Sequence, residues 1–178
     1  MTFDPVDHGW RFVNSFRTGP LAYGLCGGMV YGALDYWRAD IAIPLDRTPP
    51  RTGSRLWRYL VRRQLDAMPL AMLRRLAYYM RLNDRGLRHI THGECWLVRH
   101  AELPAPLVLI RARRLRDVTQ NHQVLAVSAD EDKLYLYDPN YPGQWAWLAW
   151  DSDNVTLLHS HDGPQRGMMV QECKAAAP

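Results

Sequence analysis

The hydrophobic pattern of this chain changes once, near Arg88, from the spacing of helices to the spacing of short strands. Before that point, apolar side chains recur at intervals of three and four residues, which is typical of helices with one buried face. After it come short runs of branched and aromatic residues separated by turns, as in antiparallel sheets. Helices first and strands second predict an α+β fold, with N-terminal helices packed on a small antiparallel sheet.

Local start and stop signals place the expected elements. The first helix runs from Cys26 to Trp37, the second follows an N-cap at Ser54, and the third follows Pro69 and ends by Asn83. On the second helix, the arginines lie mostly outside. The expected strands are residues 95–98, 107–110, 123–127, 134–137, 145–150 and 155–158. A hairpin turn at residues 130–132 joins two of them.

The composition indicates one folded domain. The chain has 178 residues, of which 47% are hydrophobic and 22% charged. We expect residues 1–173 to form the domain and the tail of residues 174–178 to be disordered. The start lacks a basic and apolar leader, and no run reaches the roughly 18 apolar residues of a membrane span. We therefore expect no membrane partner, and a protein that is cytoplasmic or exported by a signal-independent route.

Arginine supplies most of the positive charge and is concentrated between Asp46 and Arg88, where eleven arginines accompany three acidic residues. Such a segment could face an acidic or phosphorylated partner. No known nucleic-acid motif accompanies it, and the arginines have the spacing of exposed helix positions. A solvated face is therefore a stronger interpretation than a nucleic-acid site.

Cys26 opens the first expected helix, with Gly24 before it and Gly27 and Gly28 after it. At a helix N-terminus, the dipole and the unpaired N–H groups lower the pKa of a thiol. Flanking glycines leave the backbone bare, so a substrate carbonyl could approach the Cys26 N–H in an oxyanion hole. Taken alone, the segment fits a small buried apolar cysteine equally well.

Two distant residues change that balance. His122 stands at the start of one expected strand and Asp138 at the end of the next, 16 residues later. Hairpin pairing brings such ends together. An acid beside a histidine holds its tautomer and supports the imidazolium that balances a thiolate. The sequence thus predicts a triad of Cys26 as nucleophile, His122 as base and Asp138 as orienting group, with neither metal nor cofactor.

The chain resembles the papain-like cysteine peptidase superfamily, nearest to bacterial double-glycine peptidases that process bacteriocins. The matching stretches are residues 23–29, 122–124 and 137–139, in an order that spans residues 10–150. This resemblance implies a papain-like fold and a cysteine-dependent hydrolase or transferase. Its substrate would be a peptide or another amide.

One departure from the family pattern opens an alternative. The family usually has a glutamine shortly before the cysteine as second oxyanion donor, and residues 16–25 contain none. Asn14 is the nearest upstream amide, and Asn140 lies in a loop that would border the cleft. Without such a donor, the chain could be a catalytically inactive papain-like domain that serves as a binding or interaction module.

A second group of residues has the side chains of metal ligands. His92, Glu94, Cys95 and His100 lie close in sequence, but Cys173 is the only further cysteine beyond them. Because zinc needs about four ligands at regular spacing, we expect no metal site. Cys95 fits better as a core residue of a strand.

Two further sets are secondary candidates. His159 or His161 could supply an alternative base, although their polar surroundings are more typical of a solvated loop. The aromatic residues near the end of the strand region alternate as a strand face would. Most should lie in the core and one or two could line a cleft; they are Tyr141, Trp145, Trp147 and Trp150.

Overall fold

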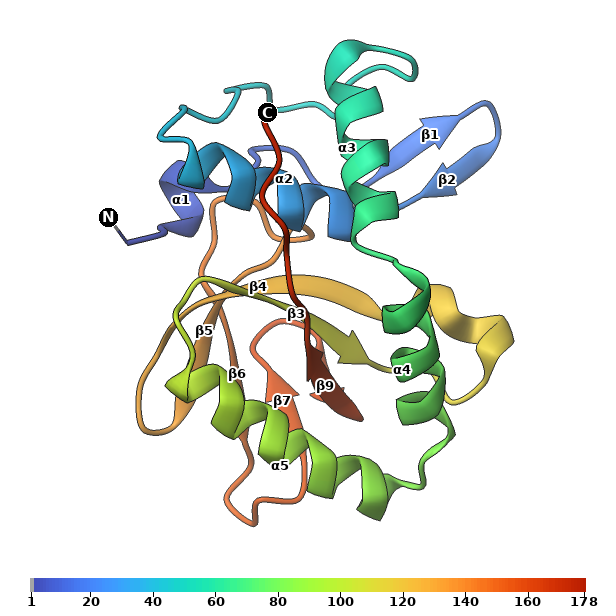
Figure 1. Cartoon of the computed structure of the whole chain (residues 1–178), viewed down its shortest axis with the longest axis vertical. Coiled ribbons are helices and arrows are strands. Elements are labelled where there is room, and N and C mark those ends of the chain that lie inside the picture. Colours follow the sequence, from blue (N-terminus) through green and yellow to red (C-terminus); the bar gives the residue numbers. More distant parts are fainter. Residues whose placement is uncertain (1) are drawn as a thin grey trace.

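The computed structural model describes residues 2–178 and confirms the α+β class, with helices and a curled antiparallel sheet (Figure 1). Its helical elements are α1 (Pro5–His8), α2 (Cys26–Arg38), α3 (Arg55–Asp66), α4 (Leu70–Arg81), α5 (Asp84–His100) and the 3-10 helix η1 (Leu115–Gln120). Its strands are β1 (Phe16–Thr18), β2 (Leu21–Tyr23), β3 (Ala105–Ile110), β4 (His122–Ala129), β5 (Lys133–Tyr137), β6 (Ala146–Trp150), β7 (Leu157–His159), β8 (Gly163–Gln165) and β9 (Gly167–Val170).

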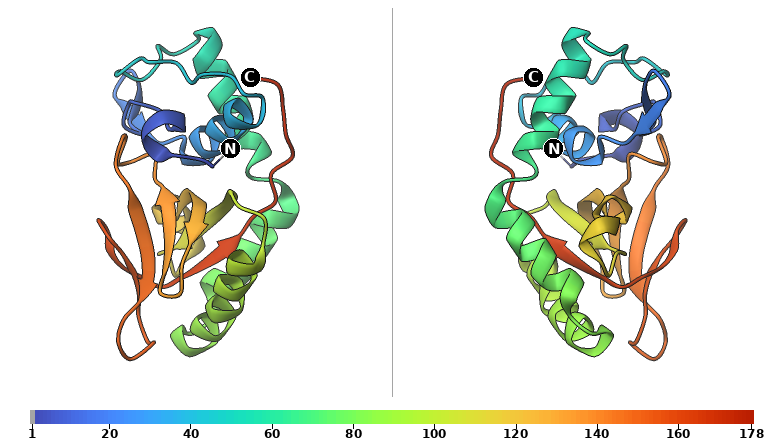
Figure 2. Two further views of the ribbon diagram at one scale, coloured as in Figure 1. Left: turned by 90° about the vertical axis from the view of Figure 1, so that its left-hand side faces the viewer. Right: turned by 90° about the vertical axis from the view of Figure 1, so that its right-hand side faces the viewer.

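The main sheet has the order β8-β7-β6-β5-β4-β3-β9, and every neighbouring pair is antiparallel. Strands β1 and β2 form a separate hairpin. The side views show α1, α2 and α3 gathered at one end and the sheet at the other, with α4 and α5 along one side of the sheet (Figure 2). The helical end and the sheet meet where α2 lies above β4 (Figure 1).

Helix α2 lies within the core, because all its residues from Gly27 to Asp35 are buried. It packs against α3, whose N-cap Ser54 accepts a hydrogen bond from the Trp57 N–H as expected. The arginines of this second helix lie mostly outside, as expected, and the exception is Arg63, which is 3% exposed. Its guanidinium pairs with the buried Asp35 carboxylate at 2.7 Å, which supplies the partner a buried charge requires.

The segment 95–98 is not a strand, as the sequence analysis expected, but the last part of α5. Asn83 caps this helix by accepting from the Gly86 N–H. Buried positions recur through the helix at Leu87, Thr91 and Val98, which is helical spacing. Within the apolar run only Cys95 and Val98 belong to this buried face, whereas Trp96 and Leu97 are exposed.

The other expected strands are present with shifted ends, and β8 and β9 were not expected. Strand β9 is the edge beside β3, and its first residue, Gly167, lies against α5. A Cβ at Gly167 would lie 2.5 Å from the Thr91 hydroxyl. This close approach explains why a glycine stands in the strand at position 167. From the sequence alone, a glycine there would indicate a turn.

The C-terminal segment contacts the helical end and does not fit the expectation of a disordered tail. The Arg63 guanidinium donates to the Lys174 carbonyl at 2.8 Å, and the Ala176 N–H donates to Asp35 at 3.1 Å. These contacts give hydrogen-bond partners to the Arg63 guanidinium and the Asp35 carboxylate, which are buried between α2 and α3. Residues 174–176 are thus part of the packed structure.

Within residues 2–178, no helix combines the length and the apolar character that crossing a membrane requires.

Candidate active site

Cys26 and His122 come together because the first turn of α2 lies directly on the start of β4. A Cβ at Gly27 would lie 2.0 Å from the Gln123 side-chain oxygen and 2.9 Å from the Ala67 Cβ, so a larger residue would force these neighbours to shift. Cys26 is the residue before Gly27, and His122 is the residue before Gln123. The same contact that packs the helix on the sheet therefore brings the thiol beside the imidazole.

His122 and Asp138 meet across the β4–β5 hairpin. Leu125 pairs with Tyr137, which places the start of β4 beside the residue that follows β5. The His122 Nε2 lies 2.7 Å from the Asp138 Oδ1, and the two residues are 5% and 0% exposed. Because Asp138 engages Nε2, Nδ1 is the ring nitrogen left for the thiol.

The environment favours a thiolate at Cys26. Burial has the largest single effect and would raise the pKa of this thiol. The hydrogen bond and positive charge of His122, together with the backbone N–H groups of Gln123 and Gly27, outweigh burial and lower the pKa below its ordinary value. The result is a thiol whose charged form is supported from the imidazole and from the helix end.

The environment also favours the cationic form of His122. Burial would lower the pKa of His122, but the hydrogen bonds with Asp138 and Cys26 raise it to about 9. Burial would likewise raise the pKa of Asp138, but the hydrogen bond with His122 and the close approach of His159 hold it well below its usual range. The three groups together support a thiolate, an imidazolium and a carboxylate.

The two other cysteines have the opposite character. Burial raises the pKa of Cys95 to about 11 and also raises the pKa of Cys173. Cys95 lies on α5 with its sulfur 3.6 Å from the Met168 sulfur. A lowered thiol pKa is therefore found at Cys26 alone among the three cysteines.

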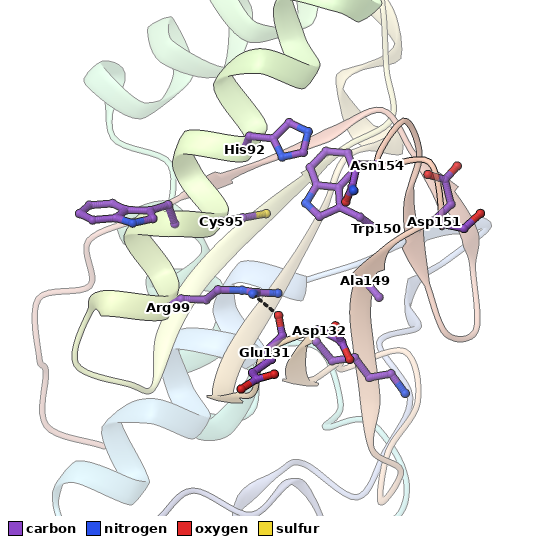
Figure 3. A pocket seen from close by; sticks show the side chains of 12 residues that line it. His92, Cys95, Arg99, Glu131, Asp132, Ala149, Trp150, Asp151 and Asn154 are labelled. Carbon is purple, nitrogen blue, oxygen red and sulfur yellow. Dashed lines mark hydrogen bonds between the residues drawn. The ribbon is translucent and has the colours of Figure 1, made fainter.

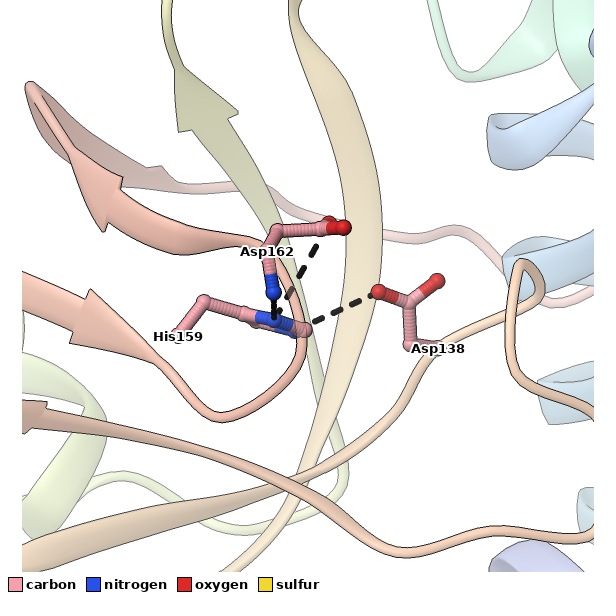
Figure 4. Close-up of side chains that lie close together, drawn as sticks. All are labelled: Asp138, His159 and Asp162. Atoms are coloured by element: carbon pink, nitrogen blue, oxygen red, sulfur yellow. Dashed lines mark hydrogen bonds and ion pairs between the residues drawn. The ribbon is translucent and has the colours of Figure 1, made fainter.

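Asp138 is held from a second side, as Figure 4 shows. Its Oδ1 also accepts from the Asn140 N–H at 2.8 Å. Its Oδ2 lies 3.3 Å from the Nε2 of His159, a residue that is 2% exposed. His159 therefore lies on the far side of Asp138 from His122. It does not occupy the position of the base, as one alternative had suggested.

A cleft of about 830 Å³ opens beside Cys26 and His122. One wall is apolar and comes mainly from α4 and its approach, with β3 and η1 contributing one residue each. These residues are Met68, Met72, Leu73, Leu76, Val108 and Val118. Methionine side chains adapt to ligands of different shape. The cleft therefore has an apolar wall that could receive an apolar group of a ligand.

The residues expected to form the cleft divide into two sets. Asn14, Gly24 and Asn140 line it together with Cys26. Gly27 and Gly28 are instead buried, and a Cβ at Gly28 would lie 2.1 Å from the Leu60 carbonyl oxygen. Their lack of a side chain serves helix packing, which corrects the expectation that both leave room for substrate.

Asn14 has partners on both sides of its amide. Its Oδ1 accepts from the Leu25 N–H at 2.6 Å, and its Nδ2 donates to the Asn140 Oδ1 at 3.1 Å. These bonds fix the entry to α2 and leave one Asn14 N–H for a ligand. The upstream amide is therefore at the cleft, but half of its donor capacity is used in the structure.

Gln64, at the end of α3, was missed by the sequence analysis. Its Oε1 accepts from the Gly28 N–H at 2.9 Å, which places the amide in front of the first turn of α2. Since Oε1 is the acceptor, Nε2 is the free end, and Gln64 lines the cleft with Cys26. Only the packing of α3 on α2 makes this position visible, because Gln64 is 38 residues after Cys26 in the sequence.

Two other places in the fold do not add to this site. A cavity of about 580 Å³ lies between α5 and the sheet, where His92 stacks on Trp150 with ring centroids 3.9 Å apart (Figure 3). Outside that cavity, Glu94 accepts from the Tyr79 hydroxyl at 2.6 Å, and the His100 ring contacts the Trp96 carbonyl. The suggested metal-ligand residues of α5 thus point to different partners.

The aromatic residues near β6 also lie away from the cleft. Trp150 borders the α5 cavity, while Trp145 and Trp147 form a shallow surface with Tyr135. Tyr141 lies next to His161, with which it stacks at 4.3 Å. Tyr23 supplies the aromatic side chain in the cleft, so the expectation that one or two of the later aromatics line it is wrong.

Asp138, His159 and Asp162 have ligand atoms within 4.8 Å of one another, which is close enough for a metal ion. Each is already engaged: Asp138 binds His122, and Asp162 pairs with the Arg111 guanidinium at 2.5 Å. The His159 Nδ1 accepts from two backbone N–H groups. The arrangement suits a hydrogen-bond network better than a cation site.

Comparison with known proteins finds no matching family model, no matching curated protein and no matching solved structure.

Proposed function

We propose that the chain is a cysteine-dependent acyl-transfer enzyme with a papain-like arrangement, acting as a peptidase or amidase. The observation that carries the proposal is the placement of Cys26, at the N-terminus of α2, in one cleft with a buried His122 whose Nε2 lies 2.7 Å from Asp138. Nucleophile, base and orienting acid in this order are what covalent catalysis by a thiol requires.

In this mechanism the Cys26 thiolate attacks a substrate carbonyl carbon. The oxyanion that forms would be bound by the Cys26 N–H and by a side-chain amide at the cleft. His122 then donates its proton to the leaving amine, and the amine departs to leave a thioester on Cys26. Water resolves the thioester in a hydrolase and a second amine does so in a transferase.

The cleft supports a substrate whose acyl side carries an apolar group. The apolar wall formed by Met68, Met72, Leu73 and Leu76 adjoins Cys26, whereas the opposite rim carries Asn14 and Asn140. A peptide with a bulky apolar side chain near the cleaved bond fits both features. The rival is a binding module that uses the same cleft without covalent chemistry.

The test is activity-based profiling of wild type and Cys26→Ala against libraries of peptides, isopeptides and other amides. We expect wild type to release or transfer products that Cys26→Ala does not form. We expect the preferred substrates to carry apolar side chains on the acyl side. If wild type and Cys26→Ala bind the same ligands and neither turns any over, the binding module replaces the enzyme.

A further inference from the structure

His159 lies behind Asp138 and takes no part in the cleft. It is the last residue of β7, it is 2% exposed, and it is absent from the cleft lining. Burying a second imidazole against a carboxylate that already binds His122 costs desolvation energy. A histidine in this place therefore calls for a physical explanation beyond filling space.

The hydrogen bonds around its ring fix the tautomer of His159. The His161 N–H and the Asp162 N–H both approach its Nδ1, at 3.2 and 3.1 Å. A nitrogen that accepts hydrogen bonds carries no proton, so in the neutral ring the proton lies on Nε2. The turn after β7 thus decides which ring nitrogen is the donor.

That donor is directed at the free oxygen of Asp138. The His159 Nε2 and the Asp138 Oδ2 face each other at 3.3 Å as a buried ion-pair contact, and neither atom has a hydrogen-bond partner among the described residues. Oδ1 of the same carboxylate serves His122 and the Asn140 N–H. His159 is therefore the one group placed to hold Oδ2 while Oδ1 faces His122.

The turn that orients His159 is itself anchored to other elements. Asp162 pairs with Arg111, which follows β3, and accepts from the Tyr141 hydroxyl. The titratable groups around Asp138 and His159 are therefore His122, Tyr141, His161, Asp162 and Arg111, with Cys26 beyond His122.

We propose that His159 is a positioning residue, which donates Nε2–H to Asp138 and thereby keeps the carboxylate aligned and ionised against His122. This inference rests on the proposed function, because its consequence is the reactivity of Cys26. If Asp138 rotates or becomes protonated, His122 loses the partner of its cation, and the thiolate–imidazolium pair reverts to a neutral thiol and imidazole. The loss should be greatest on the acid side, where an unassisted carboxylate protonates first.

Two substitutions separate the two ends of the ring. His159→Asn keeps an acceptor oxygen near Nδ1 for the turn but does not reach Asp138. His159→Gln places an amide N–H near Nε2 and so keeps the donor. His161→Asn, on the same turn but exposed and without contact to Asp138, is the matched control.

The measurement is the rate of iodoacetamide labelling at Cys26 as a function of pH. At about pH 6 we expect His159→Asn to label about tenfold more slowly than wild type, the size of one hydrogen bond to a charged group. We expect His159→Gln and His161→Asn to stay close to wild type. Wild-type labelling in His159→Asn, or equal losses in the Asn and Gln variants, would overturn the inference.

Wild type supplies a second readout that does not depend on the folding of a variant. In nitrogen-15 NMR spectra near neutral pH, we expect His159 to carry its proton on Nε2. A proton on Nδ1 would contradict the proposal. If Cys26 of wild type labels no faster than the other cysteines, the proposed function fails together with this inference; if it labels fast but is insensitive to His159→Asn, the inference alone fails.

Discussion

At the scale of single residues, the site is an arrangement of charges stabilised by their neighbours. Cys26, His122 and Asp138 are each in an environment whose burial disfavours the charged form and whose hydrogen bonds favour it. Removing any one partner therefore changes the protonation of the others as well as their geometry. The chemistry of the site can be tested by pH as well as by substitution.

Replacing Asp138 should show the pH range in which the His122 cation stabilises the fold. A histidine whose pKa is raised on folding stabilises the fold fully below its ordinary pKa of 6.5, and this contribution is lost as pH rises through about 9. We expect Asp138→Asn to lower the free energy of unfolding by about 2 kcal/mol at about pH 6 and by much less at about pH 10. Urea unfolding at both values checks this. A deficit that is independent of pH would mean that Asp138 does not act through the His122 cation.

Gln64 offers a test of the oxyanion site. Gln64→Glu keeps an oxygen to accept the Gly28 N–H but removes the amide donor from the cleft. A peptide aldehyde forms an oxyanion on Cys26. If the Gln64 amide binds this oxyanion, Gln64→Glu should lower the affinity for the aldehyde about 100-fold more than it lowers the rate of alkylation of Cys26.

Asn14→Asp is the matched control for Gln64→Glu. It adds the same charge and keeps the acceptor for the Leu25 N–H. Aldehyde affinity and the alkylation rate of Cys26 are measured on both variants. An effect of the added charge on Cys26 itself would appear in both variants and can be subtracted. A loss in Asn14→Asp without a loss in Gln64→Glu would assign the donor to Asn14 instead.

At the scale of elements, close packing of helix on helix and helix on sheet sets the geometry of the site. Gly28 touches the α3 backbone and Gly27 touches β4. The first turn of α2 therefore has little freedom to shift relative to His122.

Adding one methyl group should reveal this constraint. In Gly28→Ala the new Cβ meets the Leu60 carbonyl at 2.1 Å, so we expect a loss of about 1 to 3 kcal/mol in the free energy of unfolding. Gly93, in α5, has nothing within 4 Å of its Cβ position, and Gly93→Ala should stabilise by up to about 1 kcal/mol. Thermal and urea unfolding of both variants test the contrast. Stabilisation by Gly28→Ala would show that α2 and α3 are not packed as described.

The sequence predicted the parts of this arrangement that depend on local pattern. The helix beginning at Cys26, its cap-defined neighbour after Ser54, and the hairpin joining His122 to Asp138 all follow from periodicity and turn signals. The segment 95–98 was assigned to a strand because four apolar or branched residues are compatible with either structure. Only the buried positions farther up the same helix decide between them.

Features that depend on tertiary packing could not be predicted in the same way. Arg63 has the sequence spacing of an exposed arginine, and its burial depends on Asp35 being buried on α2. Gln64 and His159 reach the site from elements whose packing no local pattern records. Gly27 and Gly28 were expected to leave room for a substrate, but the groups that approach them belong to the protein itself.

At the scale of the whole molecule, one buried ion pair joins α2, α3 and the C-terminal segment. The Asp35 carboxylate contacts Arg63, the Tyr59 hydroxyl at 2.9 Å and the Ala176 N–H at 3.1 Å. Arg63 in turn donates to the Lys174 carbonyl. The helical end that carries Cys26 is thus held together by charges with very little access to water.

Neutralising one member of this pair should be costly. We expect Asp35→Asn to lower the free energy of unfolding by about 3 to 5 kcal/mol, because it removes the only fully buried acidic partner of a buried guanidinium and leaves it the half-exposed Asp66. Asp66 pairs with the same arginine but its side chain is 44% exposed, so Asp66→Asn should cost about 1 kcal/mol or less. Guanidinium chloride unfolding compares the two. Equal small losses would show that Arg63 is solvated and that the C-terminal segment is not docked.

The central claim is that Cys26 is an activated thiol paired with His122, and the most direct measurement is the labelling rate of the three cysteines. Wild type and His122→Ala are treated with iodoacetamide near neutral pH, and each cysteine is followed by peptide mass spectrometry. We predict that Cys26 reacts fastest and that His122→Ala slows Cys26 by about tenfold or more, with Cys95 and Cys173 unchanged. Equal rates at all three cysteines, or a Cys26 rate that His122→Ala leaves unaltered, would contradict the account.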